Sequence, residues 1–186
     1  TSKDAALLLP LSAGGYTAQI SSTTGDSGVV LVEVYDADSG TPTARFVNLS
    51  ARSQAGTGSQ TLIAGFAVSG TGTETVLIRA DGPALTPFGV TGVLAAPQLT
   101  LFDSTGVAIA TNVGWGNAST KGTSSVQATI SAATLAIFSQ VGAFALTPGS
   151  ADSAMVVALP PGSYTAQVTG ANNTTGVALV EVYEIP

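Results

Sequence analysis

Short apolar runs separated by turns rich in glycine and serine recur along the whole chain. Residues 16–21 alternate apolar and polar side chains, which is typical of a strand with one buried face. Residues 28–35 are apolar on both faces apart from Glu33, which indicates a central strand covered from two sides. The pattern therefore predicts β-strands over most of the chain.

The chain also contains an internal repeat. Residues 4–36, DAALLLPLSAGGYTAQISSTTGDSGVVLVEVYD, align without a gap on residues 152–184, DSAMVVALPPGSYTAQVTGANNTTGVALVEVYE, 148 positions later. About half of the aligned positions are identical, and such self-similarity indicates one structural unit used twice. Each unit is predicted to hold three strands. The first two are expected to form a hairpin, turning at Gly14 and Gly15 in one unit and at residues 160–162 in the other.

Between the two repeats, further strand-like runs are separated by glycine-rich turns. The polar segment 36–42 marks a boundary, so we expect an N-terminal segment over residues 1–40 and a complete module over residues 41–186. Residues 103–106, DSTG, predict the turn of another hairpin. The alanines of residues 124–138 favour a short helix. In total, the expected strands occupy residues 44–50, 60–69, 74–80, 98–102 and 107–111 besides those of the repeats. Roughly ten strands indicate an all-β fold, an antiparallel β-sandwich of immunoglobulin-like or jelly-roll-like type.

The composition is unusual for a soluble domain, because 45% of the residues are apolar and 9% are charged. The net charge is −6, and the five basic residues are scattered, so nucleic acid is not an expected partner. The apolar runs have the length of strands, and we expect no membrane insertion. The low charge suits an extracellular or cell-surface protein. With no leader sequence apparent, the chain is expected to be a mature or excised segment.

The chain has no cysteine and no histidine. Ser-His-Asp and Cys-His catalysis are therefore excluded, and no cofactor is expected. Glu33 and Glu181 occupy equivalent positions in the repeat, and we predict ion pairs with Arg45 or Arg79, or a position at the rim of the sheet, rather than an acid/base pair. The sequence thus predicts a protein that is not an enzyme.

Two other places were considered as ligand sites. Asp36 and Asp38 resemble the start of a calcium loop, but no closing acidic ligand follows, so the pattern favours an Asx-type turn. Trp115 lies between glycines in a predicted loop, where it could contact a glycan. Tyr16 and Tyr164 align with the apolar faces of their strands, which favours core packing over sugar stacking.

Six motifs of the chain resemble a known family. They are RFVNLSAR at residues 45–52, LIAGF at 62–66, VLIRADGPAL at 76–85, FGVTG at 88–92, PGSYTAQV at 161–168 and GVALVEVY at 176–183. In these motifs the chain resembles the repeat modules of large secreted and surface proteins of Verrucomicrobia and related bacteria. The resemblance implies that residues 1–40 are the tail of one repeat and that 41–186 form a complete one. It implies no catalytic residues. Related modules often read NDNWG where this chain reads NVGWG at 112–116, so an acidic residue is missing there.

The apolar side chains of the N-terminal segment are the clearest candidates for a functional surface. An uncharged apolar strand at a sheet edge invites pairing with another chain. We therefore expect a subunit interface with other copies of the chain, formed by Leu7, Leu8, Leu9, Leu11, Tyr16 and Ile20. Either a tandem array stacks its modules, or the segment completes the sheet of a neighbouring subunit. The predicted function is a structural one: head-to-tail assembly into a filament, pilus-like fibre or surface array by donor-strand complementation. An adhesin-like or carbohydrate-binding module is the alternative.

Overall fold

The computed structural model describes residues 4–38 and 44–186. It divides the chain into two compact units, Thr1–Phe46 and Val47–Pro186. We call them the first unit and the module, and each is described by itself. The division falls a few residues after the boundary at residue 40 that the sequence suggests.

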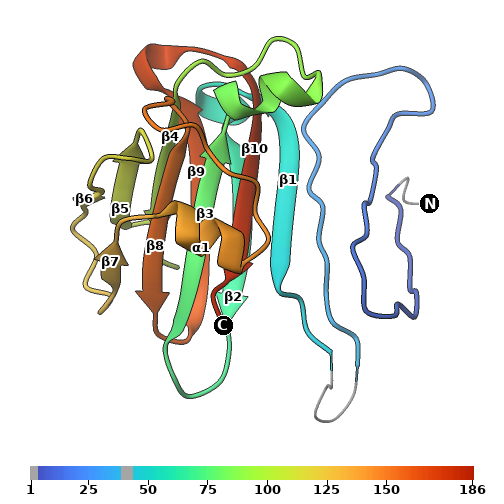
Figure 1. The fold of residues 1–186 in the computed structure, drawn as a ribbon. Coiled ribbons are helices and arrows are strands. Elements are labelled where there is room, and N and C mark those ends of the chain that lie inside the picture. Colours follow the sequence, from blue (N-terminus) through green and yellow to red (C-terminus); the bar gives the residue numbers. More distant parts are fainter. Residues whose placement is uncertain (1–3, 39–43) are drawn as a thin grey trace. The chain divides into compact units, whose positions relative to one another are not determined.

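The module is a sandwich of two antiparallel sheets (Figure 1). Sheet 1 has the order β1 (Asn48–Ala55), β10 (Gly176–Glu184), β3 (Glu74–Asp81), β8 (Ser153–Leu159) and β7 (Thr129–Ser131). Sheet 2 has the order β2 (Leu62–Val68), β9 (Gly162–Gly170), β4 (Pro97–Phe102), β5 (Ala108–Val113) and β6 (Thr120–Lys121). The predicted all-β sandwich is confirmed.

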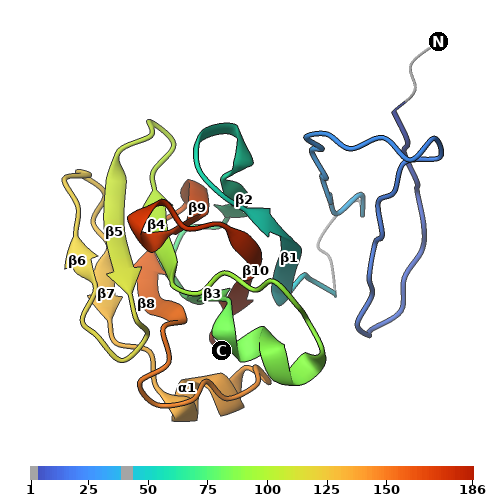
Figure 2. The ribbon, with the colours of Figure 1, turned by 90° about the horizontal axis from the view of Figure 1, so that it is seen from above.

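The view from above shows the two sheets facing each other (Figure 2), and the side chains of the main core come from both of them. The alternation of the strands places it there: in β4, Leu99 and Leu101 are buried, while Thr100 between them is partly exposed. Sheet 1 is apolar on its outer face as well. A second cluster, formed by Leu77, Val156 and Tyr183 of the sheet with Phe138 and Leu146, covers that face. The central strands of sheet 1 are therefore buried from both sides, as the composition of residues 176–183 suggests.

The three strands of the second repeat do not form the predicted hairpin. β8 belongs to sheet 1, β9 to sheet 2 and β10 again to sheet 1, so the chain crosses the core twice within the repeat. Pro160 and Pro161 lie between β8 and β9 at the first crossing. The hydroxyl of Tyr164 donates to the Pro160 carbonyl at 2.7 Å. The hairpin prediction is wrong because a tight turn between two apolar strands also fits an arch between sheets.

The helix prediction for residues 124–138 is correct only in part. α1 spans Leu135–Gln140, and the backbone N–H of Ile137 donates to the Thr134 hydroxyl at its start. Before it, Thr129–Ser131 form the edge strand β7. The β-branched residues of this stretch extend the chain where alanine alone favours a helix. Three short 3₁₀ turns complete the module, at Gly58–Gln60, Pro83–Phe88 and Ala171–Asn173.

The predicted hairpin between β4 and β5 is present. The two strands pair antiparallel, and Gly106 has a φ of 79°, which glycine adopts readily. β1 begins at Asn48, four residues later than the strand expected at residue 44, and the pair formed by Asn48 and Tyr183 is the first of its ladder with β10.

The described part of the first unit, residues 4–38 together with 44–46, contains no strand paired in a sheet. The three strands predicted for the first repeat are thus not formed there. The sequence of the repeat is suited to a sheet, but strands need partners to supply hydrogen bonds, and the first unit has none of the strands that flank the second repeat.

Candidate subunit interface

The repeat relates an exposed segment to a buried one. We call residues 4–36 the leading segment and residues 152–184, which contain β8, β9 and β10, the closing segment. The remainder of the module, residues 47–151, is called the body. In the body, β3 lies between β10 and β8, β1 flanks β10, and β2 and β4 flank β9. The closing segment therefore fills internal positions in both sheets.

The closing segment supplies a large share of the core. Met155, Val157 and Leu159 of β8 are fully buried, as are Val168 of β9 and Val180 of β10. Side chains on the other face of sheet 1, such as Val156, are buried against the second cluster. Without these three strands the body would expose both the interior of the sandwich and much of the outer cluster.

The same positions are exposed in the leading segment. Leu7 is 87% exposed and its equivalent Met155 is 0% exposed; Leu31 is 80% exposed, although the strand to which its equivalent belongs is central. The residues expected to form a subunit interface are all exposed, between 52% and 87%: Leu7, Leu8, Leu9, Leu11, Tyr16 and Ile20. The structure thus presents them at a surface, together with Val29, Val30, Val32, Val34 and Tyr35.

Local hydrogen bonds are shared by the two segments even though their surroundings differ. The Tyr16 hydroxyl donates to the Ser12 carbonyl at 2.9 Å, as Tyr164 does to Pro160. The Tyr35 hydroxyl donates to Glu33 Oε1 at 2.9 Å, as Tyr183 does to Glu181 at 2.7 Å. The leading segment therefore already holds two side-chain contacts of the closing segment.

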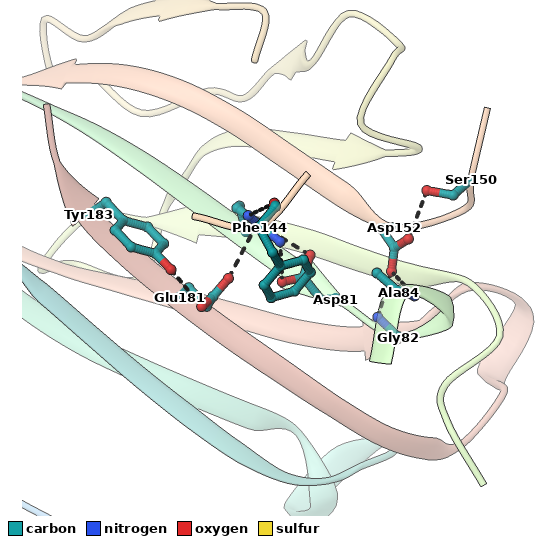
Figure 3. Close-up of polar contacts among 9 residues, drawn as sticks. Asp81, Gly82, Ala84, Phe144, Ser150, Asp152, Glu181 and Tyr183 are labelled. Carbon is teal, nitrogen blue, oxygen red and sulfur yellow. Dashed lines mark hydrogen bonds and ion pairs between the residues drawn. The ribbon is translucent and has the colours of Figure 1, made fainter. Parts of the chain in front are cut away.

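In the module, Glu181 belongs to a buried cluster of charges (Figure 3). The Arg79 guanidinium lies fully buried, with Nη2 at 2.8 Å from Asp81 Oδ2 and Nε at 3.3 Å from Glu181 Oε2. Its Nη1 donates to the Phe144 carbonyl at 2.8 Å, and its Cζ lies 4.2 Å from the centre of the Phe144 ring. The predicted ion pair between Glu181 and Arg79 is confirmed.

The electrostatics of this cluster are those of a structural site. Burial raises the pKa of Asp81 well above its usual range, and the attraction of Arg79 offsets this only in part. Burial also raises the pKa of Tyr183, and the adjacent Glu181 carboxylate raises it further. Because Arg79 and Asp81 are enclosed by protein, this cluster offers no access to a substrate.

A second buried carboxylate fixes the beginning of the closing segment. Asp152 Oδ1 accepts from the backbone N–H of Gly82 at 2.7 Å and of Ala84 at 3.1 Å. Its Oδ2 accepts from the Ser150 hydroxyl at 2.7 Å (Figure 3). Asp152 thereby ties the start of β8 to the turn that follows β3. The sequence reasoning missed this role, although the aspartate at the first position of both repeats was a signal for it.

The other sites considered from sequence have structural roles. The Asp38 N–H donates to Asp36 Oδ1 at 2.9 Å, which confirms the Asx-type turn. Among residues 4–38 and 44–186, no group of three or more acidic, cysteine or histidine side chains could hold a metal ion.

Trp115 lies inside the second cluster and is 7% exposed. Its indole N–H donates to the Thr147 carbonyl at 3.0 Å, and its ring lies 5.4 Å from that of Phe138. A sugar could stack on this ring only if the loop around it moved. The placement of Trp115 therefore gives no support to a glycan site.

Comparison with protein-family models, with curated protein sequences and with solved structures found no match. Within the described residues, no helix has both the length and the apolar character needed to cross a membrane.

Proposed function

We propose that this protein is a structural subunit, at the cell surface or outside the cell, that assembles head to tail into a filament, fibre or array. The observation that carries the proposal is the match between the two segments. Side chains that are exposed in the leading segment correspond to side chains that form the sandwich core 148 residues later. A neighbouring copy of the chain would bury them.

The amount of exposed apolar surface supports an association. Burying a leucine or valine side chain contributes roughly 1.5 to 3 kcal/mol, and twelve apolar or aromatic side chains of the leading segment are more than half exposed. Such contiguous exposure is typical of interaction surfaces rather than of isolated monomers.

The character of the strands also favours burial by a sandwich rather than by a flat surface. Residues 28–35 are apolar on both faces, and their equivalents in β10 are covered from both sides. Pairing at an exposed sheet edge would satisfy the backbone but would leave at least one apolar face in water. Insertion of the leading segment into the sandwich of another copy would both pair its backbone and bury both of its apolar faces.

Deletion of residues 1–40 tests the proposal. We expect the purified full chain to form filaments in electron micrographs and large species in light scattering, whereas the truncated chain remains a folded monomer. A matched control is Leu135→Ser, which removes a leucine that is 45% exposed in the module and should leave assembly unchanged. Filaments formed equally well by the truncated chain would refute the proposal, and so would a full chain that stays monomeric at high concentration.

A further inference from the structure

We infer that the leading segment binds in one particular place on a second copy of the chain: the groove of the body that β8, β9 and β10 occupy. Residue n of the leading segment would take the position of residue n + 148. This inference rests on the proposed self-assembly, which supplies the second copy, and it names the site where that assembly takes place.

Two carboxylates of the leading segment occupy positions at which the groove binds a carboxylate. Glu33 stands where Glu181 contacts the buried Arg79, and Asp4 stands where Asp152 accepts from the N–H groups of Gly82 and Ala84. Arg79 keeps its pair with Asp81 of the body, and a carboxylate at position 33 would restore the second contact, which Glu181 makes with Arg79 Nε at 3.3 Å.

Gly28 gives independent support. Its equivalent, Gly176, passes so close to the body that a Cβ atom there would lie 2.6 Å from the Leu94 backbone nitrogen. Around Gly28 itself, a Cβ atom would meet nothing within 4 Å. The leading segment thus has a glycine at a position where only the groove of a body requires one.

Two differences make the leading segment the weaker occupant. Pro10 replaces Ala158, which lies between β3 and β7 at the pairs with Thr75 and Thr129, and proline has no N–H for a ladder hydrogen bond. Ala5 replaces Ser153, whose hydroxyl donates to the Pro97 carbonyl at 2.7 Å. These losses explain why the body of each isolated chain is closed by residues 152–184.

Binding therefore proceeds by exchange. Each chain has one body and two segments that fit it, so a leading segment that enters a second copy releases the closing segment of that copy. The same types of contact are broken and formed, which is why such swapping is a low-cost route to association. The released segment can enter a further copy in the same way, and exchange passes from copy to copy.

Engineered cysteines can trap the exchanged state, because the natural chain has none. Val182 pairs with Leu49 across β10 and β1, and Val34 is the leading-segment equivalent of Val182. The full chain with Val34→Cys and Leu49→Cys is unfolded in urea, refolded at high concentration and oxidised. We expect a ladder of disulfide-linked dimers and larger species on non-reducing gels. The control, Val34→Cys with Ser53→Cys, places the thiols four residues out of register, too far apart for a disulfide, and should give only background.

Single substitutions added to the trapping pair give a directional test. Gly28→Ala leaves the unbound segment undisturbed but collides with Leu94 in the groove, so the ladder should decrease about tenfold. Pro10→Ala restores a backbone hydrogen bond between strands in the groove, so the amount of disulfide-linked species should increase about fivefold. Circular dichroism of the monomer fraction checks that the module remains folded in each variant.

Two results would overturn the inference: a ladder no stronger than the register control, or a cross-link formed only within single chains. The two proposals can also fail separately. If no disulfide-linked species form, but filament formation still requires residues 1–40, the groove is rejected as the binding site and the proposed self-assembly stands. If neither ladder nor filament forms, both proposals fail.

Discussion

At the scale of single residues, this chain concentrates its few charges where they fix the backbone. Arg79 ties β3 to β10 and to the loop at Phe144. Asp152 ties β8 to the turn after β3, and Asp103 organises the turn between β4 and β5.

The contribution of Asp103 to stability should depend on pH in a defined direction. Hydrogen bonds from Ser124, from the Thr105 hydroxyl and from the Val107 N–H at 3.0 Å stabilise its ionised form and hold its pKa far below the usual value. Its contribution to stability is therefore complete above the ordinary aspartate pKa of about 4 and is lost progressively as the pH falls from there through the lowered pKa of the folded state. We expect Asp103→Asn to lower the urea midpoint of the module at pH 7 and to lower it by a smaller amount, relative to the natural chain, at pH 2.5. A deficit of the same size at both pH values would contradict this account.

At the scale of elements, the crossing between β8 and β9 shows how one side chain helps to direct the chain from one sheet to the other. The Tyr164 hydroxyl reaches back four residues to the Pro160 carbonyl, in the manner of the tyrosine corner of other β-sandwiches. Its ring packs in the core, 5.7 Å from that of Phe66. The contact thus joins the crossing to the hydrophobic interior.

The repeat provides a matched pair of variants for this contact. Tyr164→Phe should lower the free energy of unfolding of the module by about 1 kcal/mol, the usual contribution of one intramolecular hydrogen bond. Tyr16→Phe removes the equivalent contact to Ser12 from the exposed leading segment and should leave module unfolding unchanged. Urea denaturation followed by the fluorescence of Trp115 measures both. Equal losses would show that the first unit contributes to the stability of the module.

The sequence predicted element types better than it predicted their pairing. Alternation in β4 and the DSTG turn fixed that hairpin, because both signals are local. The arch at Pro160 could not be told from a hairpin, since the choice depends on which sheet offers a partner to β9. For the same reason, residues 4–36 carry strand patterns without forming strands. The ion pair of Glu181 with Arg79 was predicted. The bonds of Asp152 to Gly82 and Ala84 were not, because they join residues about 70 positions apart, and their only signal in the sequence is the aspartate that begins both copies of the repeat.

At the scale of the whole molecule, the chain combines a closed module with a segment that has the composition of a core. The buried apolar residues of the module form two clusters, one on either side of sheet 1. The leading segment exposes the equivalent residues. The two copies of the repeat thus differ in their surroundings far more than in their sequence.

The exposed segment should be detectable with a hydrophobic dye. We expect the full chain at low concentration to enhance the fluorescence of anilinonaphthalene sulfonate several-fold more than a chain that lacks residues 1–40. The enhancement per chain should fall as concentration rises and the segment becomes buried between copies. Replacing Leu8 and Leu31 with serine should reduce the signal at low concentration. A truncated chain that binds as much dye would place the exposed apolar surface on the module instead.

The two ends of the module lie at the same point of sheet 1. The Glu184 N–H donates to the Val47 carbonyl at 2.9 Å, and the Asn48 side chain donates to the Val182 carbonyl beside it at 3.2 Å. Tension that draws the ends apart therefore acts first on these two bonds and then on each rung of the β1–β10 ladder in succession. A row of such modules under load would peel open from this corner one rung at a time, so Asn48 stands at the point where mechanical resistance begins.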